Sequence, residues 1–156
     1  MAFRYFEDFR PGETTLLGER VLSEGEIIGF ARAFDPQMVH LDPEAARQSR
    51  FGGLIASGWQ TCVVLMRLWV DEMLRESSAL AGTGIDDIRW PRPVRPGDRL
   101  TARVTVLEAT PSRGKPDRGF VKHHCELSNQ HGEIVMTMRS LALFGRRPER
   151  DAPALR

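Results

Sequence analysis

The chain has 156 residues, of which 28% are charged, and a formal net charge of +1 at pH 7. This length suits one domain with one hydrophobic core. The balanced charge lacks the basic excess with which nucleic-acid-binding proteins neutralise phosphates, so we expect no nucleic-acid partner.

Three features of the sequence indicate where in the cell the protein is located. The N-terminal residues "MAFRYFEDFRPGE" carry charges where a secretory signal has an apolar segment. The longest apolar stretch, residues 59–74, is too short to span a bilayer and is interrupted by Arg67, Asp71 and Glu72. With only two cysteines, Cys62 and Cys125, which we expect to be reduced, the sequence predicts a cytoplasmic protein that has no membrane partner.

A strand and a helix are predicted first along the chain. Residues 14–22 read as a strand. Ser23 stands three residues before Glu26, which is the spacing of a capping box. Apolar residues then recur at helical spacing, so we expect a helix over 23–34. Asp35-Pro36 ends it, because Pro36 disfavours helical geometry at Asp35 and leaves this carboxylate on a loop.

A short loop follows. Asp42 and Pro43 are typical of the start of another helix, with Asp as the cap and Pro at the first helical position. We therefore expect His40 to lie on a tight loop between two helices. An irregular loop is what would allow Asp35 and His40 to approach each other, because residues five positions apart are poorly matched on one helix face.

The most hydrophobic helix is predicted to begin at Ser57-Gly58. Its apolar positions cover most of its circumference, which predicts a helix surrounded by other structure. These positions are Trp59, Cys62, Val63, Leu65, Met66, Trp69, Val70, Met73 and Leu74.

From Ile85 onward the pattern changes from helical to extended. Three segments alternate as strands do: "LTARVTVLEAT", "GFVKHHCELSN" and "EIVMTMRSLALF". Helices come first and consecutive strands follow, which predicts an α+β fold with an antiparallel sheet. We expect a single domain over residues 1–146 and a disordered tail over 147–156.

In three motifs the sequence resembles the MaoC-type dehydratases of the (R)-specific enoyl-CoA hydratase group. The hydratase motif of that family has an Asp and, five residues later, a His; Asp35, His40 and the trailing Asp42 match it. The run from Phe51 to Gly58 and the turn "PVRPGD" at 93–98 match two further motifs. Gln37 and Met38 stand where the family usually has Asn and Pro, and Ser57 stands where His is commoner.

The resemblance implies a hotdog fold, in which an antiparallel sheet wraps a long central helix, and a hydro-lyase acting on an enoyl-CoA thioester. Such a reaction needs a general base and acid around one water; Asp35 and His40 are the candidates, and the sequence leaves open which one takes the first proton. Gly58, at the start of the central helix, offers a free N–H for the thioester oxygen. The further substrate-binding candidates are Gln37, Phe51, Gly52, Gly53, Ser57 and Trp59.

The same resemblance implies a homodimer or a dimer of dimers, no metal, and no cofactor apart from coenzyme A as part of the substrate. Edge pairing of two sheets would remove an exposed strand edge. His123 and His124 are adjacent on a predicted strand and so point to opposite faces, which disfavours a shared metal ion. Arg89, Trp90, Arg92 and Arg95 are candidates for the phosphates of coenzyme A, although such residues are more often a solvated edge.

Two other functions fit a hotdog fold. An acyl-CoA thioesterase of this fold generally has a carboxylate on the central helix. Here Asp71 and Glu72 lie in the C-terminal half of that helix, far from the loop motif, which disfavours this function. The other function is a non-catalytic acyl-CoA-binding module, which the Asp35/His40 pair disfavours weakly.

Overall fold

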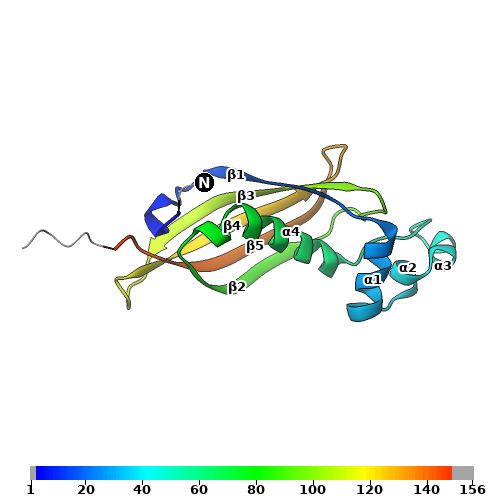
Figure 1. Ribbon diagram of the computed structural model, residues 1–156, viewed down its shortest axis with the longest axis horizontal. Coiled ribbons are helices and arrows are strands. Elements are labelled where there is room, and N and C mark those ends of the chain that lie inside the picture. Colours follow the sequence, from blue (N-terminus) through cyan, green and yellow to red (C-terminus); the bar gives the residue numbers. More distant parts are fainter. Residues whose placement is uncertain (1–2, 149–156) are drawn as a thin grey trace, which may run out of the picture.

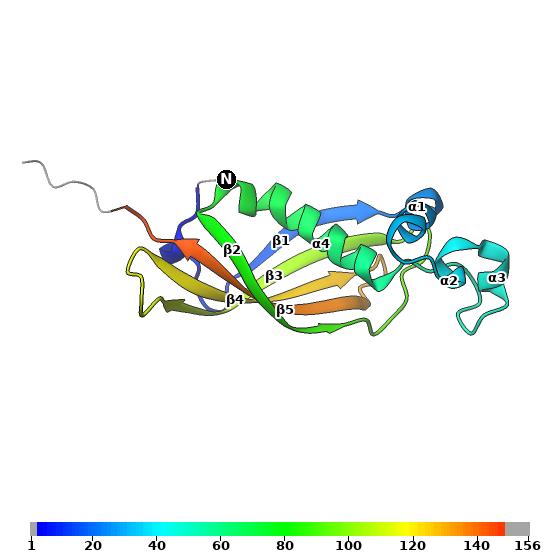
Figure 2. The same ribbon diagram turned by 90° about the horizontal axis from the view of Figure 1, so that it is seen from below.

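The computed structural model describes residues 3–148, and these form a five-stranded antiparallel sheet crossed on one face by a long helix (Figures 1 and 2). The order across the sheet is β1-β3-β4-β5-β2, so β1 and β2 are the edges. The α+β class and the antiparallel sheet are confirmed. The strands are β1 Thr14–Val21, β2 Ala79–Arg89, β3 Arg99–Pro111, β4 Arg118–Ser128 and β5 Ile134–Gly145.

The long helix is α4, Gly58–Glu72, and three shorter helices gather beyond the end of the sheet where α4 begins (Figures 1 and 2). These are α1 Glu24–Phe34, α2 Met38–Leu41 and α3 Pro43–Arg47; the 3-10 turns are η1 Phe6–Asp8 and η2 Leu74–Glu76. The capping box predicted for α1 is confirmed, because the Ser23 side chain accepts from the Glu26 N–H while the Glu26 side chain accepts from the Ser23 N–H. Asp42 caps α3, with Pro43 at its first position.

The prediction that His40 lies on a loop was wrong, because His40 belongs to the single helical turn α2. The turn closes when the His40 N–H bonds to the Gln37 carbonyl at 2.9 Å and the Asp42 N–H bonds to the Met38 carbonyl at 3.0 Å. A helix of four residues contains no repeat of apolar positions, so hydrophobic periodicity could not reveal it.

The core lies between α4 and the sheet. Val64, Leu65 and Trp69 of α4 are buried. Alternate residues of β3 and β4 are buried too, as expected for strands with one face on a core. His123 of β4 belongs to this buried face, at 1% exposure, whereas its neighbour His124 is partly exposed.

The prediction that α4 is surrounded on all sides was also wrong for the single chain. Trp59, Val63 and Met66 are 59%, 55% and 46% exposed, so one side of the helix is apolar and open. The sheet covers the other side of α4 and, within residues 3–148, leaves this side partly open. The edge strand β2 likewise exposes Leu80 and Ile85.

Strand β2 also begins earlier than expected, at Ala79. Its first half, "ALAGTG", has small residues and no apolar alternation, so its pairing with β5, which is interrupted by bulges, was not visible in the pattern. No helix within the described residues is long and apolar enough to cross a membrane.

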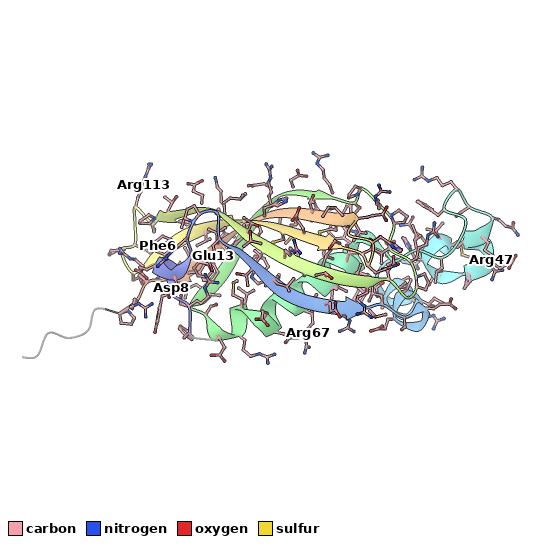
Figure 3. The ribbon with its side chains drawn as sticks, turned by 90° about the horizontal axis from the view of Figure 1, so that it is seen from above. Phe6, Asp8, Glu13, Arg47, Arg67 and Arg113 are labelled. Carbon is pink, nitrogen blue, oxygen red and sulfur yellow. The ribbon has the colours of Figure 1, made fainter. Side chains whose placement is uncertain are left out.

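The last described residues return to the N-terminal segment of the chain. Arg146 and Arg147 form ion pairs with Glu7 and Asp8. Phe6 and Asp8 lie at the end of the molecule opposite to Arg47 of α3 (Figure 3). Residues 149–156, which belong to the segment predicted to be disordered, lie outside the described residues.

Candidate active site

Asp35 lies where α1 ends and the chain turns towards α2. Its N–H makes the last bond of α1, to the Ala31 carbonyl at 2.9 Å. Pro36 follows, so the helix cannot continue and the Asp35 side chain leaves the helix axis. The side chain is 17% exposed, which places a carboxylate at the edge of the core, still reachable by solvent.

His40 is buried, and its ring has a fixed orientation. Nδ1 lies 2.8 Å from the backbone carbonyl oxygen of Ile55. A carbonyl oxygen can only accept, so Nδ1 carries a hydrogen and, in the neutral ring, Nε2 has the free lone pair. Nε2 lies 3.5 Å from Asp35 Oδ2. The two groups face each other without a tight hydrogen bond between them.

The Asp35 carboxylate accepts one hydrogen bond on each oxygen. Gln37 Nε2 donates to Oδ1 at 2.7 Å, and Ser57 Oγ donates to Oδ2 at 2.7 Å. The bond from Gln37, followed by that from Ser57, holds the pKa of the Asp35 carboxyl below its usual range, against the opposing effect of burial. Asp35 is therefore a carboxylate at neutral pH and acts there as an acceptor.

Ser57 is fully buried and joins two parts of the site. Its Oγ donates to Asp35 and accepts the Trp59 N–H at 3.2 Å, so it also caps α4. Ser57 is thus the N-cap of the helix that was predicted to begin at Ser57-Gly58, and its bond to Asp35 is a contact that the sequence did not reveal.

Gly58 opens α4, and its N–H has no hydrogen-bond acceptor among residues 3–148, as is usual for the first turn of a helix. The Trp90 indole packs against it: a Cβ at position 58 would stand 2.7 Å from Trp90 Cε2. Trp90 Nε1 also donates to the Gly58 carbonyl at 3.1 Å and to Thr61 Oγ1 at 3.1 Å. Glycine is therefore required here by close packing.

A cavity of about 410 Å³ brings most of the predicted site residues together. Asp35, His40 and Gly58 line it. So do three of the substrate-binding candidates, Gln37, Phe51 and Trp59. The residues that the sequence did not single out, or singled out weakly, are Arg50, Ile55, Ala56, Thr61, Trp90, Pro91, Arg92, Pro93, Val94 and Val135.

Three of the predicted residues do not line this cavity. Ser57 is fully buried and reaches the site only through its bond to Asp35. Gly52 has a φ of +65°, a left-handed conformation that favours glycine, and its N–H closes a turn onto the Ser49 carbonyl. Gly53 packs near the Arg95 guanidinium: a Cβ at position 53 would stand 3.2 Å from Arg95 Nη1.

The role of the Ile55 carbonyl could not be seen in the sequence, because a backbone oxygen carries no sequence signal. Its position follows from the fold: the Ile55 N–H bonds to the Val39 carbonyl, and the Ala56 N–H bonds to the Val94 carbonyl. Thr61 had a weak signal, as a hydroxyl among the mostly apolar residues of α4.

A second, larger cavity of about 680 Å³ lies further along α4, against β2 and β5. On α4 its lining begins at Cys62, one turn beyond Gly58 of the first cavity. On β5 its lining begins at Met138, three residues beyond Val135 of the first cavity. Most of its lining is apolar or small, from Met66, Trp69 and Leu74 of the helical side and residues 79–85 of β2. The two cavities therefore follow each other along the same elements.

Within residues 3–148 no group of three or more His, Cys, Asp or Glu side chains is placed to hold a metal ion. His123 is surrounded by Phe9, Trp69 and Phe144, with ring centroids 4.9–6.0 Å away. Burial lowers the pKa of His123 to about 4.

Comparison with known proteins gives relatives of similar size. The chain is 36% identical over 109 residues to the uncharacterized protein YdeM of Bacillus subtilis, covering 70% of this chain and 77% of YdeM. It is 29% identical over 118 residues to an (R)-specific enoyl-CoA hydratase of Rhodospirillum rubrum, covering 72% and 76%. By contrast, the chain spans only 32% of the length of Protein MaoC of Klebsiella aerogenes.

Solved structures of similar fold include members of the same family. A MaoC-like dehydratase from Rhodospirillum rubrum is 41% identical, with a TM-score of 0.88, covering 94% of this chain and 99% of that one. A Mycobacterium tuberculosis protein with a double hotdog fold has a TM-score of 0.76 at 18% identity, covering 96% of this chain and 46% of that one, which confirms the hotdog fold. The family model described as "MaoC like domain" matches residues 8–124. The chain belongs to the MaoC-like domain family.

Proposed function

We propose that the protein is a hydro-lyase that adds water to the double bond of a 2-enoyl-CoA thioester, or removes it from the 3-hydroxyacyl thioester. The observation that carries this proposal is the facing pair of Asp35 Oδ2 and His40 Nε2, 3.5 Å apart beside a cavity. The (R)-specific enoyl-CoA hydratase of Rhodospirillum rubrum, a relative over 72% of the chain, supports the same reaction.

The two groups suit a water molecule as their common partner. Asp35 is a carboxylate, and Nε2 of a neutral His40 has a lone pair, so both accept hydrogen bonds. A water between them would donate to both and turn its oxygen lone pairs to the substrate. In hydration the water oxygen bonds to the β-carbon, one water proton passes to the pair, and a proton from the pair reaches the α-carbon.

The thioester oxygen gains enolate character as the water attacks. The free Gly58 N–H at the start of α4 is the donor that we propose for it, because a helix N-terminus favours negative charge. The proposal needs no metal and no cofactor. Phe51 and Trp59 would contact the substrate from the cavity wall, and Gly52 and Gly53 shape the loop beside it. Arg50 and Arg92 supply positive charge for the phosphates of coenzyme A.

The second cavity would hold the acyl chain. It continues the first one along α4 and β5, and its lining is mainly apolar. Burial of methylene groups there is favourable by about 0.8 kcal/mol each. We therefore propose that acyl groups long enough to reach Met66 and Trp69 are better substrates than short ones.

The open surfaces of the single chain support a homodimer. Val63 and Met66 on α4, and Leu80 and Ile85 on β2, are apolar and exposed. An unpaired edge strand beside such a surface is a site for pairing with a second copy. We propose a dimer, alone or within a dimer of dimers, acting in the cytoplasm.

The two other functions find less support. The acids of α4 that a thioesterase would use are engaged elsewhere or remote, because Asp71 is bonded to Arg67 and Arg75 on the helix surface. A binding module without catalysis would not need the ionised Asp35 beside His40.

The test is a panel of enoyl-CoA thioesters of increasing chain length. A hydratase removes the ultraviolet absorbance of the conjugated thioester and releases no thiol, whereas a thioesterase releases free coenzyme A. Chiral analysis of the 3-hydroxyacyl product then gives the stereochemistry. Absence of both signals across the panel would favour the binding module.

A further inference from the structure

Gln37 makes an unusual local connection to the candidate catalytic carboxylate. Its Nε2 donates to Asp35 Oδ1 at 2.7 Å, and its backbone N–H donates to the Asp35 carbonyl at 2.8 Å. The two residues are separated only by Pro36, whose ring restricts φ. A residue on the surface of the loop is thus bound twice to Asp35, once through the backbone and once through the side chain.

The two oxygens of Asp35 have different surroundings. Oδ2 accepts from Ser57 and faces His40 Nε2 at 3.5 Å. Oδ1 accepts from Gln37. The terminal torsion of an aspartate is broad, with no sharp preference of its own. One donor would leave the carboxylate free to turn about that single bond, and the second donor removes this freedom.

We infer that Gln37 is a positioning residue for the hydration chemistry: its side-chain amide holds Oδ1 so that Oδ2 stays between Ser57 and His40. The inference rests on the proposed function, and it gives Gln37 a role other than contact with substrate. The amide is neutral, so it acts through hydrogen bonding and adds no charge. The ionisable side chains that line the cavity beside Asp35 are His40 of α2, Arg50 of the loop after α3 and Arg92 after β2.

The direction of the electrostatic effect agrees with the geometry. The Gln37 bond is the largest of the influences that lower the pKa of Asp35. Loss of the donor raises this pKa towards its usual range. A carboxylate with a raised pKa is protonated at higher pH, so activity that depends on ionised Asp35 would be lost at higher pH as the solution is acidified.

Three variants of the full-length protein test the inference. Gln37→Met keeps the length of the side chain and removes the donor, and Gln37→Glu places a like charge beside Asp35. Gln48→Ala is the control, because Gln48 is an exposed glutamine at the end of α3, outside the cavity lining. The measurements are kcat and KM across pH with one enoyl-CoA substrate, and the titration of Asp35 by ¹³C-carboxyl NMR.

We expect Gln37→Met to lower kcat roughly tenfold, the size of one hydrogen bond to a charged group, with KM nearly unchanged. The acid limb of the rate profile and the NMR midpoint of Asp35 should both move to higher pH, and further in Gln37→Glu. Gln48→Ala should match the wild type.

A rise in KM alone, with both midpoints unmoved, would overturn the inference and make Gln37 a substrate contact. The NMR midpoint does not depend on turnover. If the wild type hydrates no thioester, the proposed function fails, and the NMR midpoint alone still decides whether Gln37 holds Asp35.

Discussion

Ser57 Oγ donates a hydrogen bond to Asp35 Oδ2 at 2.7 Å, although the two residues are 22 positions apart in the chain. The bond joins the N-cap of α4 to the C-cap of α1. It therefore fixes the distance between the free Gly58 N–H and the carboxylate, which are the two groups that a single thioester would have to meet. A substitution at Ser57 tests both ends of this connection.

We expect Ser57→Ala to reduce stability by about 2 kcal/mol, because it removes a helix cap and a hydrogen bond to a charged group. It should also reduce the hydration rate about tenfold, because Asp35 loses one of its two donors. Ser23→Ala is the matched control: it removes the cap of α1 but has no contact with Asp35. It should lower the free energy of unfolding by about 1 kcal/mol and leave the rate unchanged. Equal rates in the two variants would contradict a role for Ser57 beyond capping.

Asp35→Asn and His40→Ala should each reduce turnover by about 10²–10⁴, the usual contribution of an acid–base group. If both groups act on one water, the double variant should be little slower than the slower single variant. Rates come from the absorbance assay, and circular dichroism checks that each variant is folded. Turnover at the wild-type level in either single variant would remove that residue from the mechanism.

The acyl chain is tested at Ala142, which lines the second cavity. Ala142→Phe fills part of that space, so kcat/KM should fall at least tenfold for long enoyl thioesters and change little for a four-carbon one. Thr83→Ala, on β2 in the same cavity, is the opposite control, because the shorter side chain enlarges the cavity. A uniform loss across chain lengths would show that the acyl group lies elsewhere.

Stability should depend on pH through His123. Its pKa in the folded protein is about 4, below that of an unfolded histidine, about 6.5. As the pH falls through 6.5 the unfolded chain gains a proton that the folded chain does not take up until about pH 4. Stability should therefore be full above pH 6.5 and decline by about 3 kcal/mol between these values.

His123→Phe should remove this decline, because a phenyl ring suits the Phe9, Trp69 and Phe144 surroundings and does not titrate. His124→Phe, on the other face of β4, should retain it. Urea titrations at a series of pH values measure both. A decline of the same size in His123→Phe would assign the acid sensitivity to another group.

Light scattering tests the dimer. Val63→Glu places a charge on the open apolar side of α4 and should give a monomer at micromolar concentration, while the wild type scatters as a dimer or a larger even assembly. Glu19→Lys, on the opposite edge strand β1, should leave the assembly intact. A monomeric wild type would contradict the proposed assembly.

Some of this structure was predictable because the signals are local. Ser23 and Glu26 mark the start of α1, Pro36 marks its end, and the alternation of β3 and β4 follows from one buried face. The spacing of Asp35 and His40 was readable as a motif. The bond between Ser57 and Asp35, the Ile55 carbonyl on His40 and the open side of α4 depend on distant segments. Hydrophobic pattern describes which residues avoid water, and it does not say which neighbour covers them.

Trp90 directly follows the last residue of β2, and its indole rests on the first turn of α4 through Gly58. A shift of the edge strand would therefore move Trp90 against the helix terminus that is proposed to hold the thioester oxygen. If a second copy pairs along β2, pairing and substrate binding become linked equilibria, and each must change the affinity of the other by the same factor. The apparent affinity for substrate would then depend on the concentration of the protein itself.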